Sequence, residues 1–204
     1  METFFFGFAG YLIGSIPVAF LLARKKHGVD LRQEGSRNIG ARNAFEATGN
    51  KRLGFVVLIL DMLKGIVPLI ILDKLGYCGM IPVVAVTMVL GHCYPVWLKF
   101  HGGRGLATGA AIALMMVPDI LLCWIIIYLV AGLIKKQVHI QALIATAGCI
   151  FFELIAYKNP LFFNVSFVCM RDKEAIQYSM LSILFIILSR HIQPVYTLLR
   201  SERS

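Results

Sequence analysis

The chain has 204 residues, of which 58% are hydrophobic and only 15% are charged, and its mean hydropathy is +0.77. Soluble domains are about 45–50% apolar and about 25% charged, so this composition excludes an ordinary soluble protein and a disordered one. It predicts an all-α membrane protein that crosses the bilayer several times. The net charge of +9 would suggest nucleic-acid binding in a soluble protein. Here we attribute it to cationic cytoplasmic loops, and we expect no nucleic-acid partner.

Apolar runs predict about seven transmembrane helices in one domain that covers residues 1–204. The runs lie near 3–23, 53–73, 79–98, 105–117, 119–134, 138–157 and 175–189. The first has an acidic residue before it and cations after it, which predicts a retained helix rather than a signal peptide. The fourth and fifth runs are short and meet at Pro118-Asp119, so one bent element is the alternative. The charged stretch 158–174 is expected to be an external loop.

The distribution of Lys and Arg predicts the orientation. With the N-terminus outside, fifteen of these residues fall on the inner side, and four fall on the outer side, with Lys64 inside a span. Cytoplasmic loops carry such an excess in membrane proteins. We therefore expect a cell-membrane protein whose N-terminus is outside and whose C-terminus is cytoplasmic. The polar loops 24–52 and 99–108 then also face the cytoplasm.

The five cysteines are scattered through the chain, with no CxxC pair. Their odd number and their spacing argue against a disulfide framework, and most are expected to be small buried hydrophobes. The five histidines form no HExxH or similar pattern, so no metal site is expected.

Two Gly-rich loops predict phosphate binding. One reads Gly35-Ser36-Arg37-Asn38-Ile39-Gly40-Ala41-Arg42-Asn43, and the other is Gly102-Gly103-Arg104-Gly105, followed by Thr108. Glycine lets the backbone approach a ligand closely, and a helix that begins after such a loop favours anions. The plainer interpretations are a capped interfacial turn for the first loop and a flexible hairpin with a topology-setting Arg for the second.

Four polar residues lie within apolar runs. Asp61 and Lys64 are three residues apart, so they share one helix face and form either a functional site or a structural ion pair. His92 comes near the inner end of the third run, where it is either a base or substrate ligand, or a packed histidine. For Glu153, a hydrogen bond across helices is the simpler interpretation.

Several motifs occur together in one order along the chain. They are Gly14-Ser15-Ile16-Pro17, Asp30-Leu31-Arg32, the Ser36 loop, Asp61-x-x-Lys64-Gly65, Gly91-His92-x-x-Pro95, Phe100-x-Gly-Gly-Arg-Gly-x-Ala-Thr108 and Arg190-His191. With them the chain resembles the bacterial acyl-phosphate:glycerol-3-phosphate acyltransferase family over essentially its full length. That family has seven helices, an outside N-terminus and a cytoplasmic site.

The resemblance implies an enzyme that moves a fatty acyl group from acyl phosphate to glycerol 3-phosphate. The products would be lysophosphatidic acid and phosphate, an early step of phospholipid synthesis. No cofactor, coenzyme A or metal would be needed. The partners would be the two substrates and membrane lipid, together with a soluble acyl-phosphate-forming enzyme that hands over its product.

The resemblance also assigns site residues by position. Ser36 and His92 would lie nearest the reacting centre. Substrate or phosphate would be bound by Asn38, Gly40, Arg42, Asn43, Lys64, Gly102, Gly103, Arg104, Gly105 and Thr108.

The chain departs from the family pattern at several positions. It has Arg104 where the family usually has Lys, and Glu46 where the family usually has Arg; Arg42 lies four residues before Glu46, so the two are expected to pair on a helix. Pro194 interrupts a polar run near the C-terminus. These changes leave two alternatives, a relative with another acceptor and a non-catalytic transporter or lipid-binding protein on the same scaffold.

Overall fold

The computed structural model describes residues 1–156, 166–169 and 172–201. The described part is helical and contains no strand, which confirms the all-α prediction. In chain order the elements are α1 (Glu2–Gly14), α2 (Val18–His27), α3 (Ala41–Thr48), α4 (Lys51–Lys74), η1 (Cys78–Met80), α5 (Ile81–Cys93), η2 (Val96–Leu98), α6 (Leu106–Met116), α7 (Pro118–Ile134), α8 (Val138–Ala156) and α9 (Lys173–Ser201). The external loop expected over 158–174 falls mostly outside the described residues.

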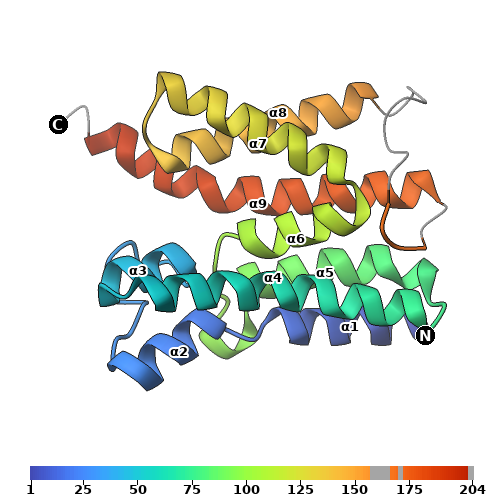
Figure 1. Ribbon diagram of the computed structural model, residues 1–204, viewed down its shortest axis with the longest axis horizontal. Helices are drawn as coiled ribbons and strands as arrows, with labels where there is room; N and C mark the ends of the chain where they lie inside the picture. The colour runs from blue at the N-terminus through green and yellow to red at the C-terminus, as the bar shows by residue number, and fades with distance from the viewer. Residues whose placement is uncertain (157–165, 170–171, 202–204) are drawn as a thin grey trace.

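The helices run along one long axis, with α1 beginning at one end and α9 finishing at the other (Figure 1). Among the described residues, five helical stretches are long and apolar enough to cross a membrane: Glu2–His27, Lys51–Lys74, Cys78–Leu98, Val138–Ile155 and Lys173–Leu198. Large apolar side chains on their outer faces are exposed, as on α4, where Phe55 is 64% exposed. An apolar exterior of this kind suits a protein that is surrounded by lipid.

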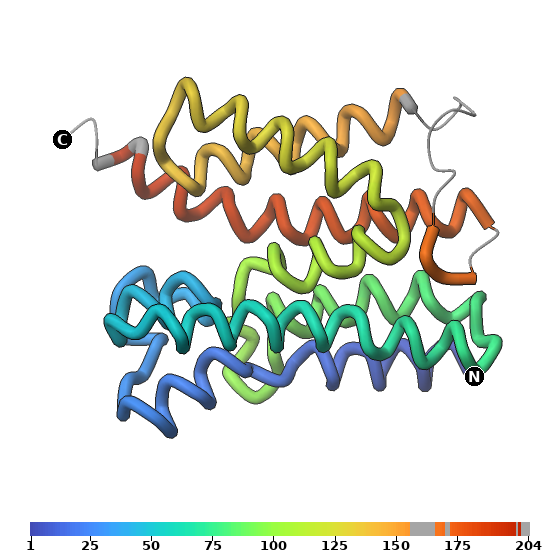
Figure 2. Tube along the Cα trace, viewed as in Figure 1, coloured from blue at the N-terminus to red at the C-terminus, as the bar shows by residue number. Residues whose placement is uncertain are grey.

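The fourth and fifth predicted spans are two helices rather than one bent element. Val117 separates α6 from α7, and α7 turns back along α6 (Figure 2). The 11 residues of α6 extend over only ~16 Å, whereas the hydrocarbon core is about 30 Å thick. The total of seven spans therefore remains a prediction.

The first apolar run forms two helices, α1 and α2, although its hydropathy predicts one continuous helix. The helix stops before Pro17, which has no N–H to donate and disfavours helical geometry in the residue before it. At the break, the Ile16 carbonyl accepts the Val18 N–H at 3.0 Å and the Lys64 ammonium of α4 at 3.2 Å. Beyond the break, α2 continues to His27 and ends at Gly28, which has a φ of +70°.

Backbone contact joins α1 to α5. A Cβ added at Gly14 would overlap the Met88 backbone, and one at Gly91 would overlap the Tyr11 carbonyl and Ser15. Small residues let helix backbones approach closely in membranes, where dispersion and polar contacts drive association. These two glycines therefore fix how closely α1 and α5 approach each other.

The last helix is longer than the predicted run. The apolar run 175–189 predicts only the middle of α9, which continues through Pro194 to Ser201. The helix thus carries Arg190 and His191 in its interior rather than in a tail.

The cysteine prediction is wrong for one pair. Cys78 and Cys169 form a disulfide across 91 residues of sequence, while Cys93, Cys123 and Cys149 are free. The Cys169 N–H donates to the Asp73 carboxylate at 2.6 Å, which holds the segment against the end of α4. Sequence spacing cannot reveal this pairing, because it depends on how the segment before α9 packs against the end of α4.

The disulfide predicts a stability difference. Removing a native disulfide costs typically 2–4 kcal/mol, since the unfolded chain regains freedom. The double variant Cys78→Ser/Cys169→Ser should therefore unfold at a lower temperature in detergent than the wild type. Cys123→Ser, which removes a free thiol, serves as the control. An unchanged unfolding temperature in the double variant would show that the pair contributes nothing to stability.

Candidate functional site

A cavity of about 670 Å³ lies where the two Gly-rich loops meet the helix bundle. The first loop contributes Asn38 and Gly40, and the second contributes Arg104 and Gly105. Remaining parts of its wall come from α3, α4, α5, α6, α8 and α9. Its polar or charged lining residues are Asn38, Arg42, Asp61, His92, Arg104, His139 and His191. The structure thus brings together loops that are about 60 residues apart in the sequence.

Asn43 holds the first loop in shape. Its side chain is fully buried; its Oδ1 accepts the N–H of Ser36 at 2.8 Å, and its Nδ2 lies within 2.9–3.2 Å of the carbonyls of Leu31, Glu34 and Asn38. These contacts use both the oxygen and the nitrogen of the side-chain amide. Asn43 therefore shapes the first loop, and its amide group is used within the protein.

Ser36 does not line the cavity. Its side chain is exposed, and its backbone points toward Asn43. It sits two residues before Asn38, which does line the cavity. Of the two residues expected nearest the reacting centre, the structure places His92 on the cavity wall and Ser36 on the rim of the loop.

Arg42 and Glu46 form the expected ion pair on α3. Arg42 Nε lies 2.7 Å from Glu46 Oε1, one helical turn away, and both side chains are well exposed. Arg42 also lines the cavity. The carboxylate of Glu46, at a position where a cation was expected by resemblance, therefore has a partner of its own.

The Gly-rich second loop packs directly against the end of α5. The N–H groups of Gly102 and Gly103 donate to the carbonyls of Cys93 and His92, at 3.1 and 3.0 Å. A Cβ at Gly103 would overlap the His92 ring, so glycine is required there by contact. Because these two N–H groups are already used, Gly102 and Gly103 position the loop rather than supply free donors to phosphate.

Arg190 of α9 fixes the same loop from the other side. Its guanidinium donates to the carbonyls of Gly102 and Gly103, at 3.1 and 3.2 Å, and lies 5.1 Å from the centre of the Tyr94 ring. In the sequence, Arg190 stands out only as part of the Arg190-His191 motif, and no role is predicted for it. Its function is visible only once α9 lies beside the loop.

Arg104 is the cation that the second loop presents to the cavity. Burial, together with the nearby charges of Arg190 and Arg42, lowers its pKa to about 10, so the guanidinium stays charged at neutral pH. Gly105 follows with a φ of +81°, a conformation that suits glycine, and α6 begins after it. The start of α6 thereby adds backbone N–H groups and a positive helix end beside Arg104.

A buried polar cluster supports the opposite wall. Asp61 Oδ1 lies 2.8 Å from Lys64 Nζ and 3.6 Å from His92 Nδ1. Thr108 donates its hydroxyl to the Asp61 carbonyl at 3.0 Å, and its Oγ1 lies 3.4 Å from His92 Nδ1. The structure therefore pairs Asp61 with Lys64, and it turns the Nε2 side of His92 toward Gly103.

His139 and His191 were missed as site residues. Both line the cavity, and their ring centroids are 6.4 Å apart. His191 belongs to a motif seen in the sequence, but nothing near His139 marks it as functional. Within the described residues, no three His, Cys, Asp or Glu side chains gather as metal ligands.

The arrangement suits a phosphorylated substrate. Arg42, Arg104 and the start of α6 offer positive charge and donors to phosphate oxygens. His92 offers an imidazole nitrogen that can accept a proton from a hydroxyl group. The cavity is therefore equipped to hold a phosphate and to activate a neighbouring hydroxyl.

Comparisons with known proteins point to one family. The family model for glycerol-3-phosphate acyltransferase matches residues 4–201. A glycerol-3-phosphate acyltransferase of Anaeromyxobacter dehalogenans is 35% identical over 199 residues, which cover 95% of this chain and 92% of that protein.

Two solved structures of PlsY (YgiH), an integral membrane glycerol 3-phosphate acyltransferase, have the same fold. Its glycerol 3-phosphate form is 30% identical with a TM-score of 0.77, covering 98% of this chain and 94% of that one. Its lysophosphatidic acid form is 28% identical with a TM-score of 0.75, covering 98% and 93%. The chain therefore belongs to the glycerol-3-phosphate acyltransferase family.

Proposed function

We propose that this protein transfers a fatty acyl group from acyl phosphate to glycerol 3-phosphate, which yields lysophosphatidic acid and inorganic phosphate. The observation that carries the proposal is the cavity that Arg42, Arg104, the start of α6 and His92 line together. The solved relatives named for glycerol 3-phosphate and lysophosphatidic acid match a substrate and a product of this reaction.

The proposed reaction needs alignment more than activation. Acyl phosphate is a mixed anhydride, so the acceptor hydroxyl oxygen attacks the acyl carbon and the bond from that carbon to the phosphate oxygen breaks. The released phosphate carries away the negative charge, and the hydroxyl proton passes to the imidazole of His92. Holding the two substrates together supplies much of the rate increase. Metal, coenzyme A and other cofactors have no place in this scheme.

Each site residue has a proposed role in this scheme. Arg104 and Arg42 bind phosphate, and Ser36 and Asn38 contact it from the rim of the first loop. Thr108, Asp61 and Lys64 orient His92, while Gly40 and Gly105 let α3 and α6 begin at the cavity.

We further propose that the protein lies in the bacterial cell membrane with seven spans and a cytoplasmic site. The charge distribution supports this orientation. The Cys78–Cys169 disulfide supports it independently, because disulfides persist in oxidising compartments outside the cytoplasm. A cytoplasmic site would let a soluble enzyme hand over acyl phosphate.

Replacing Arg104 should weaken phosphate binding. Purified protein is given palmitoyl phosphate and glycerol 3-phosphate, and phosphate and lysophosphatidic acid are measured together. Arg104→Ala should lower kcat/KM by roughly tenfold to a hundredfold, because a hydrogen bond to a charged group contributes about 1.5–3 kcal/mol. Ser36→Ala should fall in the same range, and Arg104→Lys should keep part of the activity.

Arg200→Ala is the matched control, since Arg200 is exposed near the end of α9. If well-folded wild-type protein forms neither product, the proposed reaction is wrong. If the Arg104 variants remain fully active while Ser36→Ala loses activity, the proposal that Arg104 binds phosphate is wrong.

Adding a methyl group at Gly103 should disturb both loop and histidine. In Gly103→Ala the new Cβ would overlap the His92 ring, and overpacking costs typically about 1–3 kcal/mol. We expect a lower unfolding temperature and a loss of acyl transfer. Gly79→Ala is the control, because a Cβ at that position meets nothing within 4 Å. Equal behaviour of the two variants would contradict the contact.

Cysteine labelling in intact cells tests the orientation. Glu2→Cys, at the start of α1, should react with a membrane-impermeant thiol reagent. His101→Cys, at the exposed residue just before the second loop, should react only with a permeant reagent or after lysis. The reverse pattern would place the catalytic cavity outside the cytoplasm.

A further inference from the structure

A second cavity lies deeper in the bundle, between α6, α7 and α9. It encloses about 440 Å³ of unfilled space, part of it open to the surface. Its lining is apolar: the residues are Leu106, Gly109, Ala110, Ala113, Ile120, Leu121, Trp124, Met180, Ile183, Leu184 and Ile187. No charged side chain lines it, so it suits a hydrocarbon and not a phosphate.

This apolar cavity adjoins the polar one. Leu106 lines both cavities. On α9, His191 lines the polar cavity and Ile187 the apolar one, and residues four apart occupy the same face of a helix. A molecule with a phosphate at Arg104 could therefore extend its chain past Leu106 into the space beyond.

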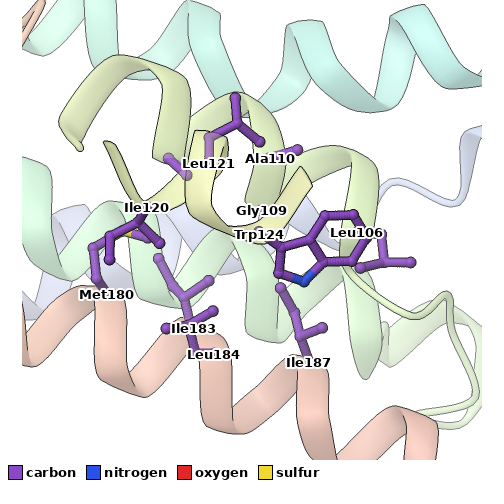
Figure 3. A pocket seen from close by; sticks show the side chains of 11 residues that line it. Leu106, Gly109, Ala110, Ile120, Leu121, Trp124, Met180, Ile183, Leu184 and Ile187 are labelled. Atoms are coloured by element: carbon purple, nitrogen blue, oxygen red, sulfur yellow. The ribbon is translucent and has the colours of Figure 1, made fainter. Parts of the chain in front are cut away.

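The entrance side of the apolar cavity has a rigid wall. Figure 3 shows Leu106, Trp124 and Ile187 at one end of the cavity. The Trp124 indole N–H donates to the Thr146 hydroxyl at 3.0 Å, and its ring stacks on Tyr128 with centroids 5.0 Å apart. Trp124 is thus held in place from α8 and from its own helix, and it confines whatever passes it.

The far end of the cavity is closed. Ile120 and Met180 stand there (Figure 3), and each is only 1% exposed. Behind them, Val117 and Ile176 belong to the same buried core. The wall is seven residues long on each of two helices, from Leu106 to Ala113 on α6 and from Met180 to Ile187 on α9. This corresponds to ~10 Å along the helix axis. An extended palmitoyl chain is longer than this.

We infer that this cavity receives the acyl chain of the donor, and that Met180 and Ile120 at its closed end set which chain length is used best. The inference rests on the proposed function, because it assumes that acyl phosphate is the donor. A closed end produces a length preference, since interiors are close-packed and a longer chain must displace side chains.

The test is a series of acyl phosphates of increasing chain length with glycerol 3-phosphate as acceptor. In the wild type, kcat/KM should rise by about fourfold for each methylene that enters the cavity, and then fall once the chain is longer than the cavity. Met180→Ala deepens the cavity and should move the optimum to longer chains by about two methylenes. Ala110→Leu narrows it and should move the optimum to shorter chains.

Two controls separate the cavity from general damage. Met180→Leu keeps the volume and should restore the wild-type optimum. Ile126→Ala removes an apolar side chain of α7 that is 52% exposed and does not line the cavity, so its optimum should not move. If Met180→Ala and Ala110→Leu keep the wild-type length profile, the inference is overturned.

A binding measurement keeps the test independent of catalysis. Non-transferable alkyl phosphonates of the same lengths, used at one concentration, raise the unfolding temperature more the more tightly they bind, and the variants should shift the best length in the same directions. If the wild type makes no lysophosphatidic acid but these shifts occur, the proposed reaction fails and the length-setting cavity stands. If acyl transfer occurs but neither profile shifts, the cavity inference alone fails.

Discussion

The site depends on direct backbone contact between the second Gly-rich loop and the end of α5. Gly102 and Gly103 donate to the two carbonyls that α5 leaves free at its end, and Arg190 holds the loop carbonyls in turn. This contact sets the position of Arg104 and the start of α6 relative to His92. Side chains at either glycine would push the loop outward and separate the phosphate-binding groups from the histidine.

Around this contact, polar and apolar side chains are distributed in the opposite way to a soluble domain, with apolar residues outside and charged residues inside. Large apolar side chains such as Phe55 face outward, while Asp61, Lys64 and His92 are buried near the loop. Charges at such a depth are costly unless they are paired. The polar cavity and the apolar cavity meet at Leu106, so a charged head and a hydrocarbon chain can each find matching surroundings within one molecule.

Much of this could be predicted from sequence. Hydropathy gave the helical class and most helix positions, because burial in lipid demands long apolar runs. Spacing gave the Asp61–Lys64 and Arg42–Glu46 pairs, since neighbours on one helix face are local. The two loops were expected to cooperate, and they do line one cavity.

What could not be predicted depends on contacts between distant segments. The break before Pro17 is tied to another helix, because Lys64 reaches the Ile16 carbonyl from α4. Cys78 meets Cys169 only when the segment before α9 packs against the end of α4, and Arg190 meets the Gly-rich loop only when α9 lies beside it. The same is true of His139, which has no local signal. Asn43, Gly102 and Gly103 were expected to touch the ligand, but their groups are used within the protein, a distinction that only three-dimensional geometry reveals.

The lysine at the break in the first span also constrains how the sequence can change over evolutionary time. Its ammonium satisfies the carboxylate of Asp61 and the carbonyl of Ile16 at once. A neutral residue at position 64 would take the ammonium partner from the buried Asp61 carboxylate, and a neutral residue at position 61 would leave the ammonium with the Ile16 carbonyl alone. A single substitution at either position therefore carries a penalty that a paired change avoids. Positions 61 and 64 are expected to covary among descendants of this chain.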